Sequence, residues 1–221
     1  MANGKVITGY SKPYVALYTY ENDTITYSNG MPLARGVNVS VEAENGNGVN
    51  FYADNVVAES VGGIFTGATI TMTVDGLKEP ARKLIMGLPE AEEISVGGET
   101  YNVVKYDNRQ QIPYVGIGFC VRYMENGNTT YTAVVFKKAA FSVDGLSANT
   151  QEESIEFQTT ELKATLMRDD SQYQEWKNLV EELPSESDAE AAIKALLGIS
   201  ESSNNSDDNN NNDGDNQDTG A

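Results

Sequence analysis

The chain has 221 residues, with 33 acidic and 15 basic side chains, no histidine and a single cysteine, and its formal net charge is −18. A surface this acidic repels phosphate and anionic lipid, which argues against nucleic-acid binding and against attraction to anionic membranes. The lack of histidine excludes zinc sites built on histidine and mechanisms with a histidine base, and one cysteine excludes an internal disulfide.

Alternating apolar and polar residues predict antiparallel strands in the first third of the chain. Residues 14–28 read YVALYTYENDTITYS, which predicts a hairpin that turns at residues 21–23. Residues 37–43 and 64–74 alternate with the period of two that a half-buried strand requires. Both segments are therefore predicted to be strands of one core.

The residues 44–63, between those two strands, do not alternate. They hold glycines near both ends and aromatic residues in the middle. A connection of this length inside a compact domain is usually either functional or disordered, and its aromatic and valine content argues against disorder. We predict a projecting flap that is buried against another molecule.

The period changes at residues 78–88, which read KEPARKLIMGL. Apolar residues recur there at i, i+3, i+4 and i+7, which predicts a helix docked on the sheet, with a proline near its start and a glycine near its end. Two hairpins follow, one over 94–107 that turns at Gly97-Gly98 and a longer one over 115–136 that turns at Asn126-Gly127.

Two details of the later strands are predicted from their side-chain pattern. Gly116 and Gly118 share one face of their strand and leave room for another backbone or a bulge. In the same strand, Cys120 has no neighbouring motif that would stabilise a thiolate, so we expect it to fill space in the core. Residues 155–166 form a strand whose apolar positions change from odd to even, and a β-bulge at 159–161 would reconcile its two halves.

The last part of the folded chain is predicted to contain two helices. Ser171 is suited to cap the first, over 171–183, and a capping box that begins at Ser187 starts the second, which ends before Gly198. The final segment, 201–221, holds six acids, no base and almost no apolar residue, so its composition predicts disorder. Residues 1–200 still carry a net charge of −12. The acidity therefore belongs to the folded part.

No residue pattern indicates catalysis or metal binding. Adjacent acids such as Glu92-Glu93 point to opposite faces of a strand and are poor partners for acid–base work. The loop ending at Asp213-Gly214 lacks the aspartate and glutamate that an EF-hand needs at its first and twelfth positions. We expect no catalytic residue, no cofactor and no metal, and hence no enzyme. Two acids distant in sequence that meet, as in a glycosidase, are the one alternative left open.

The segments VNFYADN, FTGATITMTVDG and KEPARKLIMGL, in this order, resemble the major tail protein of long, non-contractile-tailed bacteriophages, the siphophages. The resemblance covers residues 1–166 and is most specific at 50–55 and 65–88. It implies a mainly β fold, a β-sandwich or barrel-like core with a flanking helix and a long β-hairpin flap. It also implies hexameric rings that stack into a tail tube, through which DNA leaves the capsid.

The same resemblance implies which residues touch a neighbouring subunit or ring. Phe51 and Tyr52 are the expected anchors, because large aromatics carry much of the energy of interfaces. Packing beneath their own loop is the alternative for these two residues. Residues 1–10 are expected to form a second arm that becomes ordered on stacking. The expected contact residues are Val49, Asn50, Phe51, Tyr52, Ala53, Asp54, Asn55, Val56 and Val57.

The resulting organisation is a tail-tube β domain over 1–168, a helical extension over 169–200 and an acidic tail over 201–221. The implied partners are further copies of the chain, a tape measure protein, and tail terminator and distal tail proteins. DNA would pass through the lumen without specific binding. No membrane is expected as a partner, because the chain lacks a signal-peptide core and an apolar run of membrane-spanning length. The expected location is the virion tail, with the host cytoplasm as the place of assembly.

Two other functions fit the same pattern. One is the tube protein of a contractile tail or of a related secretion machine. The other is a monomeric adhesion or carbohydrate-binding β-sandwich, which would expose clustered aromatics and would not assemble with itself.

Overall fold

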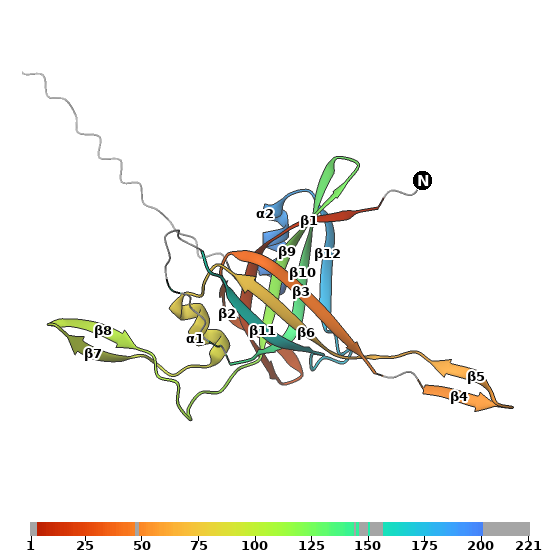
Figure 1. The fold of residues 1–221 in the computed structure, drawn as a ribbon, viewed down its shortest axis with the longest axis horizontal. Helices are drawn as coiled ribbons and strands as arrows, with labels where there is room; N and C mark the ends of the chain where they lie inside the picture. Colours follow the sequence, from red (N-terminus) through yellow and green to blue (C-terminus); the bar gives the residue numbers. More distant parts are fainter. Residues whose placement is uncertain (1–3, 47–48, 144, 146–149, 151–156, 201–221) are drawn as a thin grey trace, which may run out of the picture.

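The computed structural model describes residues 4–46, 49–143, 145, 150 and 157–200. Over these residues the fold is mainly β, as the sequence predicts, with twelve strands and two helices (Figure 1). In chain order the elements are β1 (Val6–Glu21), β2 (Thr24–Pro32), β3 (Gly36–Asn45), β4 (Val49–Ala53), β5 (Val56–Val61), β6 (Phe65–Val74), α1 (Glu79–Met86), β7 (Glu92–Val96), β8 (Glu99–Val103), β9 (Val115–Glu125), β10 (Asn128–Phe141), β11 (Thr160–Met167), β12 (Lys177–Leu183) and α2 (Glu186–Leu196).

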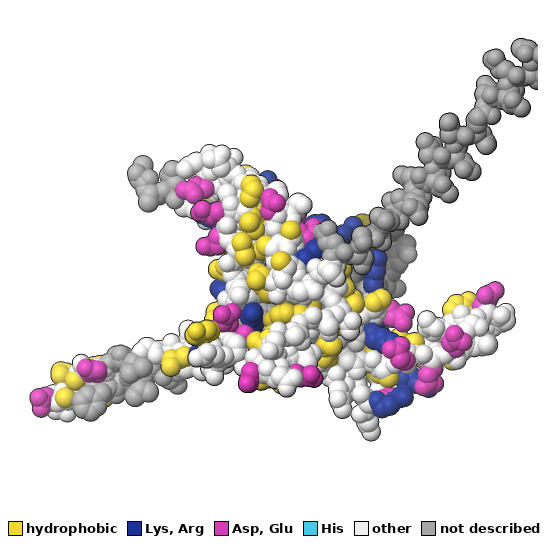
Figure 2. All heavy atoms as spheres, turned by 180° about the vertical axis from the view of Figure 1, so that it is seen from behind, with side chains coloured by type: hydrophobic (Ala, Val, Ile, Leu, Met, Phe, Trp, Pro, Cys, Tyr) yellow, Lys and Arg dark blue, Asp and Glu magenta, His cyan; other side chains and the backbone are white. Residues whose placement is uncertain are grey.

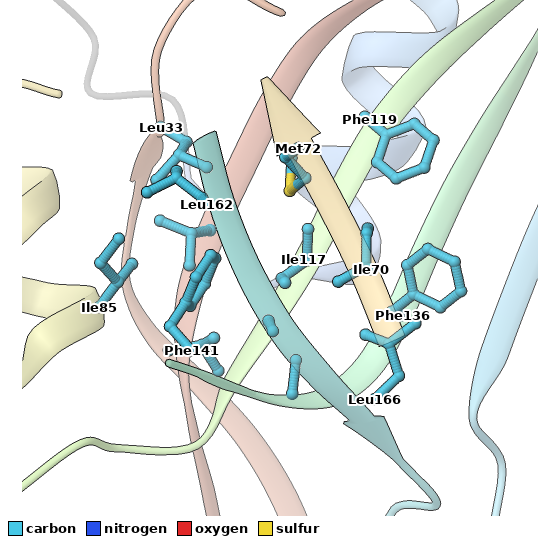
Figure 3. Close-up of a cluster of buried hydrophobic side chains, with 14 of the residues drawn as sticks. Leu33, Ile70, Met72, Ile85, Ile117, Phe119, Phe136, Phe141, Leu162 and Leu166 are labelled. Carbon is cyan, nitrogen blue, oxygen red and sulfur yellow. The ribbon is translucent and has the colours of Figure 1, made fainter. Parts of the chain in front are cut away.

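Eight of the strands form one antiparallel sheet in the order β2-β1-β9-β10-β11-β6-β3, with β12 paired to β10 outside this path. The long strand β10 holds the sheet together. Its residues Tyr131–Phe136 pair with β12, while Lys138–Phe141 pair with β11. A register shift against β9 between Phe136 and Ala139 separates the two parts. The sheet folds over itself at this strand, so β6 and β11 lie across from β9 and β10 (Figures 1 and 3).

The main hydrophobic core fills the space between these two halves of the sheet. Side chains from β6 and β11 point toward those of β9 and β10, and Ile85 of α1 closes one side (Figure 3). β6 and β11 contribute every second residue, the alternation that the sequence predicts for 64–74 and for the second half of 155–166. Core members seen in Figure 3 include Leu33, Ile70, Met72, Ile85, Ile117, Phe119, Phe136, Phe141, Leu162 and Leu166.

A second hydrophobic cluster lies on the outer face of β1, β9 and β10, beneath α2. Ile193 and Leu197 are buried there beside Cys120. A Cβ atom built on Gly118 would lie 2.5 Å from Cγ2 of Ile193, and one on Gly116 would lie 2.6 Å from Cδ2 of Leu197. The room left by the two glycines is therefore filled by helix side chains rather than by backbone or a bulge.

The turns are formed where local chemistry predicts them. Asn22 and Asp23 connect β1 to β2 with positive φ angles of 49° and 57°, as a two-residue turn of type I′ requires. Helix α1 ends at Gly87, which adopts the left-handed conformation with φ 59°. The predicted turns at Gly97-Gly98 and Asn126-Gly127 are confirmed as well.

The predicted helix over 171–183 is wrong, because this segment forms a turn and then strand β12. Ser171 does not cap a helix, since its hydroxyl donates to Oδ1 of the buried Asp169 at 2.6 Å. Trp176 stacks on Phe65 with ring centroids 4.1 Å apart, and Val180 packs against the second cluster. Backbone pairing with the open edge of β10 outweighs the helical spacing of the apolar residues. Of the two predicted C-terminal helices only α2 forms, and residues 169–200 join the sheet and its second core.

Three further expectations change in detail. Helix α2 begins two residues early, because Oγ of Ser185, rather than Ser187, accepts a hydrogen bond from the Asp188 N–H at 3.1 Å. Strand β11 starts at Thr160 and pairs with β6 without interruption, so no bulge forms at 159–161. Phe157, which the sequence predicts in the first half of this strand, precedes it and is 94% exposed. Most of the expected N-terminal arm, from Val6 on, is paired with β9. The predicted disordered tail, 201–221, lies outside the described residues.

Candidate functional site

The predicted flap is a β-hairpin that stands away from the body of the molecule (Figure 1). Its strands β4 and β5 pair only with each other in a separate two-stranded sheet. Asp54 and Asn55 form the turn between them, with φ angles of 49° and 64°. The flap leaves the body at the end of β3 and returns at the start of β6, two strands that are themselves paired. The pairing of β3 with β6 in the main sheet therefore fixes the point at which the flap is attached.

A narrow neck joins the flap to the sheet. The Gly46 N–H donates to the Ile64 carbonyl at 2.8 Å, and the Thr66 hydroxyl donates to the Glu44 carbonyl at 3.1 Å. A Cβ atom on Gly63 would lie 2.3 Å from the backbone oxygen of Gly46, too close for any side chain. The neck therefore requires glycine at position 63 and sets the direction in which the flap projects.

The nine residues expected to contact a neighbour all lie on this hairpin: Val49 to Ala53 on β4, Asp54 and Asn55 in the turn, and Val56 and Val57 on β5. Tyr52 and Val56 are 61% and 63% exposed, and Val57 is exposed as well. Tyr52 therefore does not pack beneath its own loop. The side chain of Phe51, the other expected anchor, lies outside the described part of the structure.

Among the flap side chains that the structure describes, apolar ones are exposed on both faces. Tyr52 lies opposite Val57 in the hairpin register, and Ala53 lies opposite Val56. Because opposed residues share a face and successive residues alternate, the two pairs occupy opposite faces. A partner that covers these side chains would have to enclose the hairpin from both sides.

A second hairpin arm, β7–β8, projects from the other side of the body (Figures 1 and 2). The sequence predicts this hairpin but not its projection. Ile94 lies opposite Tyr101, and both are about half exposed, whereas the neighbouring Glu93 and Asn102 occupy the other face. The apolar side chains of the arm thus share one face, which also carries Glu92 and Glu99, and the other face is polar. A hairpin packed in the core would show the same alternation, so the sequence holds no signal of this projection.

Isolated two-stranded hairpins are marginally stable in water, because they bury little apolar surface. Both arms leave valine, isoleucine or tyrosine side chains in solvent, and neither adds a strand to the main sheet. Exposed apolar surface concentrated on projecting elements is typical of protein–protein contacts. The arms are therefore the best candidates for the functional part of the molecule.

Two ionisable groups of the body, Glu190 and Cys120, lie where α2 packs on the sheet. Glu190 on α2 accepts hydrogen bonds from Tyr14 at 2.5 Å and from Lys194 at 3.1 Å, and it pairs with Lys12 at 2.9 Å. Burial raises the pKa of Glu190, but the bonds from Tyr14, Lys12 and Lys194 outweigh it and lower the pKa to about 2. Burial raises the pKa of the Cys120 thiol to about 11, so the thiol stays protonated at neutral pH.

Within the described ranges, no three acidic or cysteine side chains come together in a way that could hold a metal ion. No helix in the same ranges is long and apolar enough to cross a membrane. No family model matches the chain, and no curated protein matches it.

Proposed function

We propose that the chain is a structural subunit that assembles with copies of itself, head to tail, into the hexameric rings and stacked tube of a siphophage tail. The observation that carries the proposal is the pair of projecting hairpins with exposed apolar side chains on opposite sides of a rigid β body. A head-to-tail contact joins two different surfaces of one chain, and repeating it gives rings or open filaments. Two arms that point in different directions suit such a repeat.

Open strand edges support the same proposal. β2 and β3 are the two ends of the sheet order, so each has an edge unpaired within the described chain. Val37 and Val41 on β3 are exposed, although Val41 lies opposite the buried Ile70. Edges with exposed apolar residues promote pairing with other chains, and such pairing would continue the sheet from one subunit of the proposed tube to the next.

The charge fits a conduit for DNA. Residues 1–200 carry a net charge of −12, and a wall of this sign repels phosphate and lets DNA slide without adhering. In the proposed assembly the tape measure protein fills the lumen before ejection, and terminator and distal tail proteins close the two ends. The tube is part of the virion tail and is built in the host cytoplasm.

Electron microscopy of the purified protein tests the proposal. Rings or tubes support it, and a monodisperse monomer at high protein concentration contradicts it and favours the adhesion-type alternative. Deleting residues 46–62 should abolish stacking and leave the body folded, because the flap shares no strand with the main sheet. If the protein forms tubes and its gene lies beside a gene for a sheath protein, the chain would instead belong to a contractile tail or a related secretion machine.

A further inference from the structure

A groove of about 910 Å³ lies between β1, the start of β3 and the start of α1. We call it the β1–α1 groove, and it is formed by residues from segments 11–14, 31–36 and 75–81. Met31, Leu33 and Ala81 supply apolar lining. Its volume is large enough for the side chains of a hairpin tip. No segment of the described chain fills it.

The groove is lined by three cationic side chains and one acid, Asp75, whereas the charged side chains of the flap are all acidic. Lys12, Arg35 and Lys78 line it with exposed side chains. Lys12 pairs with Glu190 and Arg35 pairs with Asp75. Lys78 forms no ion pair within the described chain. By contrast, the flap, residues 44–63, contains three acids, Glu44, Asp54 and Glu59, and no base. The charge of Lys78 is therefore available to attract an acidic side chain of the flap.

The groove and the flap lie at opposite ends of the same pair of strands. Gly36 pairs with Val74 at the groove end of β3 and β6, and Asn45 pairs with Phe65 at the flap end. The two ends are separated by the ten residues of β3, a span of roughly 30 Å. A second copy displaced along this direction brings its flap to the groove of the first.

We propose that the β1–α1 groove is the acceptor for the flap of a second copy. The groove encloses the hairpin tip and covers Tyr52 on one face and Val56 on the other. Asp54 and Glu59 then lie near the cationic rim, where Lys78 has a free charge. The contact is head to tail, so each copy donates one flap and accepts another. This inference rests on the proposed function and names the surface through which that assembly repeats.

Cross-linking tests the contact directly. The chain has one cysteine, Cys120, which is fully buried, so introduced surface thiols react selectively. A variant with Tyr52→Cys and Ala34→Cys, treated with a short bis-maleimide, should give a ladder of covalent multimers on denaturing gels. The matched control keeps Tyr52→Cys and moves the second thiol to Tyr173, which is 79% exposed and outside the groove. This control should give no ladder.

Charge reversal gives an independent readout. Lys78→Glu in the groove and Glu59→Lys in the flap should each raise the protein concentration needed for tube formation about tenfold. The double variant should form tubes at the wild-type concentration. Lys163→Glu, which reverses an exposed charge outside the β1–α1 groove, is the control and should leave assembly unchanged.

The outcomes separate this inference from the proposed function. If the wild-type chain forms tubes that need the flap, but the thiols do not cross-link and Lys78→Glu assembles normally, the flap binds elsewhere and the inference is overturned. If the wild-type chain forms no rings or tubes, the proposed function fails, and this inference fails with it.

Discussion

The hydroxyl of Tyr14 on β1 donates a hydrogen bond of 2.5 Å to Oε1 of Glu190 on α2. This bond ties the C-terminal helix to a strand near the other end of the chain. Lys12 and Lys194 converge on the same carboxylate. Although burial opposes ionisation, the three donors hold the pKa of Glu190 at about 2. The docking of α2 therefore depends on an ionised carboxylate.

Stability should depend on pH through Glu190. Its pKa is about 2 in the folded state against 4.5 as the ordinary value, so its contribution is complete above pH 4.5 and is lost as the pH falls toward 2. After allowance for solvent screening, we expect the free energy of unfolding to fall by an amount on the order of 1–2 kcal/mol over this pH range. Urea unfolding followed by the fluorescence of Trp176, the only tryptophan, measures it. The difference in free energy of unfolding between the wild type and Glu190→Gln should become smaller as the pH is lowered from 5 to 3. A difference that is constant across this range would contradict the assignment.

The contact between Gly118 and α2 should tolerate no added methyl group. A Cβ atom there would lie 2.5 Å from Cγ2 of the fully buried Ile193. Overpacking of this kind costs about 1–3 kcal/mol, so Gly118→Ala should lower the free energy of unfolding by that amount. Gly9→Ala is the matched control in β1, because its nearest neighbour is an Arg122 carbon at an ordinary 3.6 Å. Equal stability of the two variants would show that α2 packs less closely on Gly118 than the 2.5 Å distance indicates.

The neck of the flap offers a test with adjacent residues. Gly63→Ala places a Cβ atom 2.3 Å from the Gly46 oxygen and must turn the flap, whereas Gly62→Ala meets nothing within 4 Å. We expect Gly63→Ala to reduce tube formation at least tenfold with little change in melting temperature, because the clash lies outside the core. Gly62→Ala should assemble like the wild type. Normal assembly of Gly63→Ala would show that the direction of the flap is unimportant.

The β7–β8 arm should act through its apolar face. Tyr101→Asp places a charge beside Ile94 on that face, and Asn102→Asp places the same charge on the polar face. We expect Tyr101→Asp to weaken assembly, as measured by sedimentation and electron microscopy, and Asn102→Asp to have little effect. Both should unfold at the temperature of the wild type, because these side chains are exposed. An equal effect of both variants would indicate general repulsion instead of a contact.

The bore of the assembled tube should be net negative. The body has an excess of acid, and DNA must pass without adhering to the wall. A cryo-electron microscopy map of the tube would identify the residues that face the lumen. A neutral or basic inner surface would contradict the conduit model.

Local chemistry made most of the fold predictable. The turns at Asn22-Asp23, Gly97-Gly98 and Asn126-Gly127 depend on residues that tolerate positive φ, which is a property of the residues themselves. Alternation along β6 and the stripe on α1 indicate burial directly. These signals act over a few residues, so they can be read without knowledge of the fold.

The failures have a common physical cause. In residues 171–183 the apolar spacing fits a helix, but the open edge of β10 and the Phe65 ring, both distant in sequence, select a strand. The position of the flap could be predicted from its length and flanking strands. The projection of β7–β8 could not, because a hairpin that packs in a core and one that stands in solvent have the same turn and the same alternation. The β1–α1 groove is formed by three segments that are distant in sequence, so no local pattern indicates it.

Strand β10 has a consequence for how the molecule unfolds. β12 pairs with its first part, β11 with its last part and β9 with both, so both halves of the sheet lose backbone partners when β10 is removed. Calorimetry should accordingly show a single cooperative transition for the body. A chain broken within β10 should lose both cores together.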